Sequence, residues 1–277
     1  MLALQFFIGT TVVLQSSIRA GPIASTPSSM VNSTLPPASW AALSKAVAGA
    51  KNGTVYNLDP ATFTRGYTGP AIHLKGKAIT INGNGIVLDA KGSGHFFEVT
   101  DAAALTLSRV TLRRGHNSDG DGGAIYAGGS STINIYDSNI VSNTASSGGA
   151  IYSYHSTVNV RNSTLVNNTA SYQYHFGGGG AIYATGAGYR VNIYSSSINS
   201  NTATKYGGGI CAQEATVSIF NSTLMNDTAD EKGAGGAVHS TSPSVHIDSS
   251  SNVTSNSNPQ VVNGSSNLNV DVLWKVN

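Results

Sequence analysis

GGAIYA at residues 122–127 recurs four more times along the chain, as GGAIYS at 148–153, GGAIYA at 179–184, GGGICA at 207–212 and GGAVHS at 235–240. Successive copies begin 26, 31, 28 and 28 residues apart. A period of this length is typical of repeat proteins, in which each repeat forms one supersecondary unit that stacks on its neighbours. The motif therefore predicts stacked units from Gly122 to Asn256.

Each repeat contains three pieces that we predict to be extended. The first is GGAIY. The second has aliphatic residues at i and i+2 between mostly polar ones, as in TINIY at 132–136, which is the alternation of a half-buried strand. The third closes the unit, as in IVSNTA at 140–145, and degrades to NVTSNSN in the fifth repeat. Such short repeats leave no room for a crossover helix.

These features predict an all-β fold, a parallel β-helix in which equivalent strands of successive repeats pair in parallel and three sheets surround one core. A β-sandwich also has short strands separated by turns, but it does not need a fixed period. The pattern continues in weaker form between Thr54 and Gly115. We therefore expect about seven coils, counted at the repeat period.

Alternation along the strands predicts which side chains fill the core. One inward column is expected to contain Ile72, Phe97, Ile125, Ile151, Ile182, Ile210 and Val238. A second inward column is expected to contain Ile79, Leu105, Ile133, Val158, Val191, Val217 and Val245. At the end of the third strand a polar column, whose side chains can bond one another and the turn backbone, contains Asn143, Asn168, Asn201 and Asp227.

The pairing of GGAI with a closure of the form apolar-x-x-Asn resembles the repeats of the chlamydial polymorphic outer membrane proteins. Those repeats pair GGA[ILV] with FxxN, and Ile or Leu replaces the Phe here, as in Ile140-Val141-Ser142-Asn143. The resemblance covers residues 105–256. It implies a single-stranded right-handed parallel β-helix of the pectin/pectate-lyase-like class, displayed outside the cell. The family also carries an autotransporter barrel, which we do not expect in this chain, so its surface anchoring is not carried over.

Composition and charge fit one large β domain. Charged residues make up 10% of the 277 residues and the formal net charge is +2. Nucleic-acid-binding proteins usually carry a concentrated basic face, so we expect no nucleic-acid partner. Abundant Gly, Ser, Thr and Asn, with aliphatic residues at regular positions, indicate turn-dense β structure and not disorder.

Four segments are expected along the chain. Residues 1–20 resemble a signal peptide, although no Lys or Arg precedes the apolar run. Residues 21–38 are a Pro/Ser/Thr-rich flexible linker. Residues 39–53 are an amphipathic helix that caps the open end of the β-helix, which occupies residues 54–277. No later segment is expected to span a membrane, so we predict a secreted or cell-surface protein.

The sequence contains one cysteine and two matching glycosylation sequons that bear on covalent modification. Cys211 is the only cysteine, which excludes an internal disulfide, and its place among the outward tyrosines indicates no chemical role. The glycosylation sequons at Asn162 and Asn221 occupy matching turns between strands, so these are the predicted glycosylation sites of a glycoprotein.

A candidate catalytic corner runs from Arg113 to Asp121. In pectate-lyase-like proteins the loops at this corner wall the substrate cleft. Asp119 and Asp121 are candidates for acid–base work or for a Ca²⁺ site, with Arg113 or His116 handling a proton. The alternative is ordinary turn chemistry, in which Arg113 and Arg114 pair with the two aspartates. The outward first-strand column contains one carboxylate where the lyases cluster several, so we lean against catalysis and against a cofactor.

An outward column of tyrosines is the candidate ligand-binding site. Tyr126, Tyr152 and Tyr183 follow the inward isoleucines, and an insertion at 171–178 adds Tyr172 and Tyr174. Such a strip can stack on sugar rings or anchor a protein partner, but it can also simply stabilise the sheet. Tyr136, Tyr194 and Phe220 form a second, interrupted strip.

The favoured interpretation is a secreted or surface-displayed β-helix that acts as a non-catalytic adhesin or glycan-binding scaffold. Its expected partner is a glycan or a cell-surface protein. A polysaccharide lyase or hydrolase is the first alternative. An ice-binding protein is the second, because Thr132, Thr157 and Thr216 form a column of small side chains. Arg190 interrupts this column, which argues against ice binding. The ligand and the oligomeric state are left open.

Overall fold

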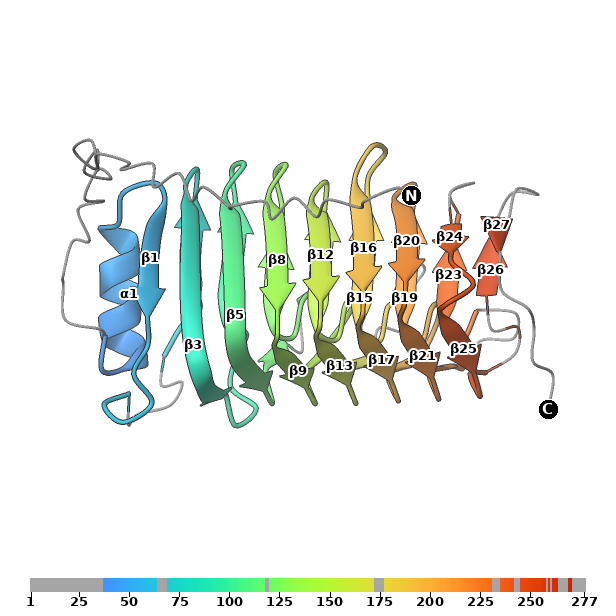
Figure 1. Ribbon diagram of the computed structural model, residues 1–277, viewed down its shortest axis with the longest axis horizontal. Coiled ribbons are helices and arrows are strands. Elements are labelled where there is room, and N and C mark those ends of the chain that lie inside the picture. The colour runs from blue at the N-terminus through green and yellow to red at the C-terminus, as the bar shows by residue number, and fades with distance from the viewer. Residues whose placement is uncertain are drawn as a thin grey trace, which may run out of the picture. The chain divides into compact units, whose positions relative to one another are not determined.

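The computed structural model describes residues 37–63, 69–117, 120–171, 177–230, 235–241, 245–257, 259, 261–263 and 269–270. They belong to one compact unit, Pro36–Asn277. This unit is a parallel β-helix of about seven coils with one helix near its N-terminal end (Figure 1). The predicted signal peptide and nearly all of the predicted linker lie outside the described residues.

The strands form three sheets, as predicted. The first sheet contains β2 (Ile72–Lys75), β4 (Phe97–Thr100), β7 (Ile125–Ala127), β11 (Ile151–Tyr154), β15 (Ile182–Thr185), β19 (Ile210–Gln213), β23 (Val238–Ser240) and β26 (Val261–Asn263). The smallest sheet contains β6 (His116–Asn117), β10 (Thr144–Ala145), β14 (Thr169–Ala170), β18 (Thr202–Ala203) and β22 (Thr228–Ala229).

The largest sheet contains two columns of strands. The second-strand column consists of β1 (Thr54–Asn57), β3 (Ala78–Asp89), β5 (Ala104–Arg113), β8 (Thr132–Tyr136), β12 (Thr157–Arg161), β16 (Arg190–Tyr194), β20 (Thr216–Phe220), β24 (Val245–Ile247) and β27 (Asn269–Val270). The third-strand column consists of β9 (Asn139–Val141), β13 (Thr164–Val166), β17 (Ser197–Asn199), β21 (Thr223–Met225) and β25 (Asn252–Thr254). The long strand β5 pairs with both β8 and β9, and this joins the columns.

Each regular coil has four strands where the sequence predicted three extended pieces. The closing piece LVNNTA divides into β13 and β14 at Asn167, whose φ is +56°. Ser142, Ser200 and Asn226 occupy the same position with φ of +54°, +54° and +57°. A left-handed residue turns the chain sharply, and serine and asparagine tolerate it better than bulky residues do. The closing piece therefore turns a corner.

Both predicted inward columns are confirmed. The first-sheet column from Ile72 to Val238 pairs position by position and is buried throughout. The column from Ile79 to Val245 does the same in the second strands. Burial of these aliphatic ladders supplies the main driving force for stacking.

The glycine pair that begins each motif is required by space. Gly148 has φ of +60°, and a Cβ there would lie 2.3 Å from the carbonyl oxygen of Ile151. A Cβ at Gly149 would lie 2.3 Å from the carbonyl oxygen of Gly180 and 2.5 Å from the main-chain nitrogen of Thr169. Main-chain atoms cannot move aside as a flexible side chain can, so both positions exclude a side chain.

The predicted polar column is a buried ladder of hydrogen bonds. Asn143 donates from Nδ2 to Asn168 Oδ1 at 3.0 Å, and Asn168 donates to Asn201 Oδ1 at 3.0 Å. Asn201 donates to Asp227 Oδ1 at 2.9 Å. The ladder extends into the degenerate fifth repeat, where Asn256 Oδ1 accepts from the Asp227 main-chain nitrogen at 2.8 Å. These bonds satisfy groups that would otherwise be buried without partners.

A second buried polar ladder was not predicted. At the corner between the second and third strands, Ser163 Oγ accepts from the Ser138 main-chain nitrogen at 3.0 Å and donates to the Arg161 carbonyl at 2.7 Å. The same arrangement recurs along the corner at Ser138, Ser196 and Ser222, and Ser251 Oγ accepts the Ser222 N–H. One hydroxyl per coil thus accepts a hydrogen bond from a main-chain N–H of the preceding coil and donates one to a carbonyl of its own coil.

The predicted capping helix is α1 (Trp40–Ala48), with Ser39 as its N-cap. Its buried residues are Trp40, Leu43 and Val47, and the Trp40 ring meets Phe97 edge-on at 5.5 Å. Lys77 Nζ donates to the Val47 carbonyl at 2.8 Å and to the Ala48 carbonyl at 3.0 Å, which caps the C-terminus.

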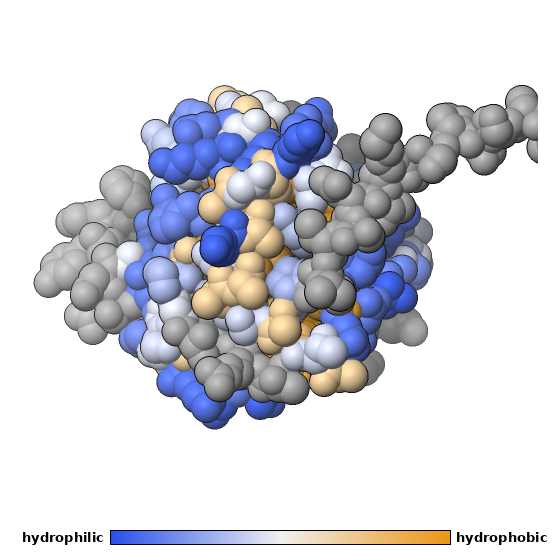
Figure 2. All heavy atoms as spheres, turned by 90° about the vertical axis from the view of Figure 1, so that its left-hand side faces the viewer, coloured by the Kyte–Doolittle hydropathy of each residue, from blue (hydrophilic) through white to orange (hydrophobic). Residues whose placement is uncertain are grey.

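The helix ends at Ala48, five residues before the predicted end at residue 53, because Gly49 forms the C-cap. Its outward residues include Ala41, Ala42 and Ala48. The view onto this end shows a pale apolar strip framed by hydrophilic side chains (Figure 2).

Candidate functional site

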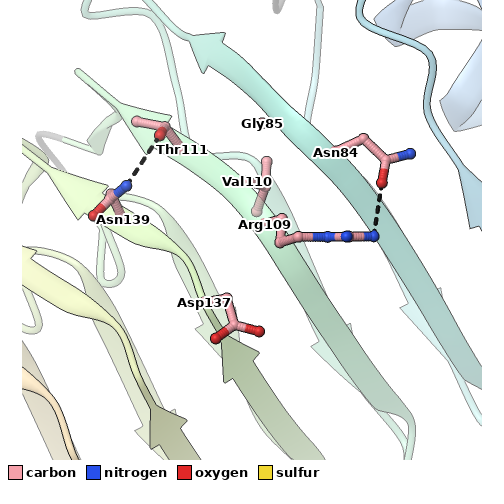
Figure 3. A pocket seen from close by; sticks show the side chains of 7 residues that line it. All are labelled: Asn84, Gly85, Arg109, Val110, Thr111, Asp137 and Asn139. Atoms are coloured by element: carbon pink, nitrogen blue, oxygen red, sulfur yellow. Dashed lines mark hydrogen bonds between the residues drawn. The ribbon is translucent and has the colours of Figure 1, made fainter.

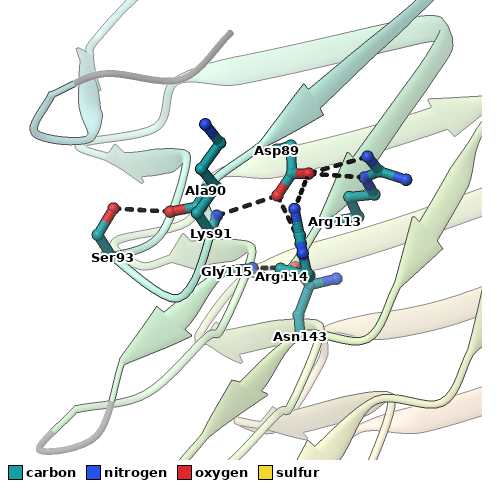
Figure 4. A network of polar contacts seen from close by, with 8 residues as sticks. All are labelled: Asp89, Ala90, Lys91, Ser93, Arg113, Arg114, Gly115 and Asn143. Atoms are coloured by element: carbon teal, nitrogen blue, oxygen red, sulfur yellow. Dashed lines mark hydrogen bonds and ion pairs between the residues drawn. The ribbon is translucent and has the colours of Figure 1, made fainter.

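The predicted catalytic corner does not assemble around its arginines. Arg113 and Arg114 both bind Asp89, which is the strand partner of Arg113 one coil earlier (Figure 4). Arg113 Nε donates to Asp89 Oδ2 at 2.9 Å, and Arg114 Nε donates to Asp89 Oδ1 at 2.8 Å. Hydrogen bonding to Arg114 holds the Asp89 pKa at about 2. The expectation that these arginines pair with the Asp119/Asp121 turn is therefore corrected.

The other candidates of this corner are dispersed. Asp119 lies outside the described residues. His116 is exposed, and its main-chain nitrogen donates to the Gly94 carbonyl at 3.0 Å. Asp121 is half-buried; burial raises its pKa, while hydrogen bonds from the Ser147 hydroxyl and N–H act in the opposite direction. Within the described residues, no group of three or more His, Cys, Asp or Glu side chains could hold a metal ion.

The first-sheet tyrosines form a stacked ladder. The Tyr126 and Tyr152 ring centroids are 5.4 Å apart, and those of Tyr152 and Tyr183 are 5.2 Å apart with an interplanar angle of 1°. Because β11 lies between β7 and β15, both faces of the Tyr152 ring are covered by its neighbours. A sugar ring therefore cannot stack on Tyr152, and only its edge is available.

Two members of this column are buried, although the sequence placed them outward. Tyr183 is 4% exposed and Cys211 is fully buried. A Cβ at Gly178 would lie 3.2 Å from Cys211 Cβ, so the main chain of Gly178 packs close to the Cys211 side chain. Burial raises the Cys211 pKa to about 12. The outward placement of Tyr183 is therefore corrected, and its binding role stays a prediction. Tyr172 and Tyr174 lie outside the described residues.

A more open polar surface lies on the second-strand column. Its outermost row contains Ser108, Tyr136, Arg161, Tyr194 and Phe220 at paired positions. The Arg161 Cζ lies 5.6 Å from the Tyr194 ring centroid, and Phe220 stacks on Tyr194 at 5.1 Å. Since β16 lies between β12 and β20, the faces of the Tyr194 ring are occupied here as well. The row presents ring edges, a phenol and a guanidinium.

Beside this row runs an outward ladder of amides. Asn159 Nδ2 donates to Asn134 Oδ1 at 2.8 Å, and Asn192 Nδ2 donates to Asn159 Oδ1 at 2.8 Å. An amide nitrogen has two hydrogens, so each of these side chains keeps one N–H for another partner.

Two adjoining hollows border the row at the corner between the second and third strands. One, of about 480 Å³, is lined by the residues of Figure 3, where Arg109 donates to Asn84 Oδ1 at 2.7 Å. The other, of about 510 Å³, is lined by Ser108, Tyr136, Asn159, Arg161, Asn162 and Tyr194 among others. Asp137 lines both. We call these two hollows together the corner groove.

The sequence revealed the interrupted aromatic strip but not the corner groove. The signal that could have found it is the left-handed corner after each second strand, occupied by Arg109, Asp137 and Asn162 with φ of +51°, +48° and +49°. Asn162 and Asn221 are exposed at this corner, and their glycosylation stays a prediction. The threonine row is interrupted by Arg190, the strand partner of Thr216, as the sequence indicated.

Part of one repeat of this chain matches a known protein family. Residues 195–213 match the Chlamydia polymorphic membrane protein repeat. This stretch includes β17, β18 and the GGGICA motif, so the resemblance inferred from the motif is confirmed for it. No curated protein and no solved structure matches the chain. In the described part of the chain, no helix has the length and apolar character needed to cross a bilayer. The chain is therefore a β-helical scaffold that carries at least one repeat of this kind.

Proposed function

We propose that the chain is a non-catalytic scaffold, secreted or displayed at a cell surface, that binds a glycan in the corner groove. The observation that carries the proposal is the lining of this groove. Tyr136, Asn159, Arg161 and Asp137 supply hydroxyl, amide, guanidinium and carboxylate groups along one shallow depression. Sugars are recognised by this combination of polar groups placed beside aromatic surface.

The repeat of the scaffold favours an extended ligand. Strands of successive coils lie about 4.7–4.9 Å apart, so a chain that follows the helix axis meets equivalent side chains at that interval. The Asn134, Asn159 and Asn192 amides are placed in this way. A cell-surface protein is the alternative partner, and it would need a larger buried area than the groove offers.

The test is retention on a glycan array, followed by calorimetric titration with each retained oligosaccharide. The protein is produced in a host that does not glycosylate it, because a glycan on Asn162 would enter the groove. Asn159→Ala should weaken binding, whereas Ser218→Ala, two strands farther along the same outward row and outside the groove, should not. Equal affinities of these two variants, or no retained glycan, would reject the proposal. Loss of binding in Tyr126→Phe/Tyr152→Phe instead would move the site to the first sheet.

Polysaccharide cleavage is a second candidate, favoured by Asp121 alone. Burial raises the pKa of this carboxyl group beside Tyr126, as a general acid requires. Release of reducing or unsaturated sugars that is lost in Asp121→Asn would support this activity. Binding without product at any pH would exclude it for the glycans tested.

A further inference from the structure

We infer that the ligand of the corner groove carries an anionic substituent, which Arg161 binds. The inference rests on the proposed function and specifies its substrate class. It begins from the environment of one side chain. Arg161 is exposed at the end of β12, and no carboxylate among the described residues lies within ion-pair distance of its guanidinium.

The other arginines near this surface are engaged differently. Arg113 and Arg114 share the Asp89 carboxylate, and Arg109 donates to Asn84. Arg161 is instead held over the Tyr194 ring. Contact with an aromatic ring restricts the guanidinium and leaves its N–H groups available to other acceptors. A planar fork of donors held in this way suits bidentate binding of a carboxylate or a sulfate.

Asp137 supplies the complementary contact. Its carboxylate lines the same hollow and accepts a hydrogen bond from Asn162 Nδ2 at 3.3 Å. A carboxylate accepts hydrogen bonds and repels anions, so it suits the hydroxyl groups of the ligand and not its charge. Arg161 and Asp137 together therefore fit an acidic sugar, with its charge at Arg161 and its hydroxyls at Asp137 and Asn159.

The experiment compares three oligosaccharides of equal length by calorimetric titration: an oligouronate, a sulfated oligosaccharide and a neutral one. Arg161→Gln should weaken the anionic ligands roughly tenfold to hundredfold, which is the range for a hydrogen bond to a charged group. Arg161→Lys should recover part of the loss. Arg190→Gln is the matched control, because Arg190 is exposed on the same column but does not line the groove.

Each outcome has a distinct meaning. Preference for the uronate or for the sulfated ligand identifies the source of the charge, and either result supports the inference. Equal losses in Arg161→Gln and Arg190→Gln would indicate nonspecific attraction and overturn it. Equal affinity for neutral and anionic ligands, with binding still lost in Asn159→Ala, would overturn it and leave the proposed function standing. If none of the three ligands binds, both this inference and the proposed function are rejected.

Discussion

Replacing Asp227 by asparagine should stabilise the β-helix at pH 8 and change its stability little near pH 4. Asp227 is the one acid in the buried ladder, and Asn201 donates to its Oδ1 from both the main-chain nitrogen and Nδ2, at 2.8 and 2.9 Å. Asn168 and Asn201 each donate Nδ2 to the carbonyl of a third-strand residue one coil earlier. The equivalent acceptor for Asp227 is the Ile198 carbonyl, which an ionised Oδ2 would repel. No described group donates to that Oδ2.

The magnitude follows from the pKa of this carboxyl group. Burial raises the Asp227 pKa from 3.8 to about 7, despite the hydrogen bonds from Asn201. A raised pKa means that the folded state holds the proton more tightly than the unfolded state. Its contribution to stability is therefore complete below pH 3.8, falls as the pH rises towards 7, and is fully lost above it. At 1.36 kcal/mol per pH unit the total loss is about 4 kcal/mol.

The assay is equilibrium urea unfolding of the wild type and Asp227→Asn at pH 4, 6 and 8, followed by two spectroscopic probes. Asparagine cannot ionise and restores the amide donor of the ladder, so the advantage of the variant should grow by up to about 4 kcal/mol between pH 4 and pH 8. Asp248→Asn is the control. Despite some desolvation, hydrogen bonds from Ser250 and Ser251 lower the Asp248 pKa, so that variant should be less stable above pH 4. A difference between Asp227→Asn and wild type that is the same at pH 4 and pH 8 would refute the reasoning.

Three further predictions concern the scaffold; the first two can be checked by urea unfolding and the third by amide hydrogen exchange. Gly149→Ala should destabilise the protein by at least about 2–3 kcal/mol, because the new Cβ would overlap main-chain atoms. Gly69→Ala is the control and should not destabilise it, because its Cβ would meet only a Trp40 atom at 3.8 Å. Ser163→Ala leaves the buried Ser138 N–H without its acceptor and should cost about 1–3 kcal/mol. Lys77→Met should increase amide hydrogen exchange in α1, because three carbonyls at its C-terminal end lose their donor. Unchanged exchange there would show that the lysine does not hold the helix.

The sequence predicted the repeating core because the core depends only on alternation and period. Ile125 and Ile151 could be assigned to one inward column since a period-two pattern fixes the face of each residue. Asp89 could also have been found as the partner of Arg113, since the two lie opposite each other one coil apart.

Other features depend on contacts that alternation does not encode. The pattern places Tyr183 on the outward face of its sheet, but it cannot show that this face is covered there. Serine is so common in this chain that the buried ladder at Ser138 and Ser163 has no distinctive signal except its repeat position. The corner groove depends on how two strand columns meet at Asp137, which no single strand reveals.

The stacking of coils in register is tested most directly by distances along one outward row. Ser218 and His246 lie four and five strands beyond Thr106 in one outward row. In a Cys211→Ser background, spin labels are placed at 106 and 218, or at 106 and 246. The distance between the two labels is measured by pulsed electron–electron double resonance. We expect separations of about 19 and 24 Å, from the spacing of about 4.8 Å per strand. Separations that do not increase by one strand spacing between the two pairs would contradict the β-helix.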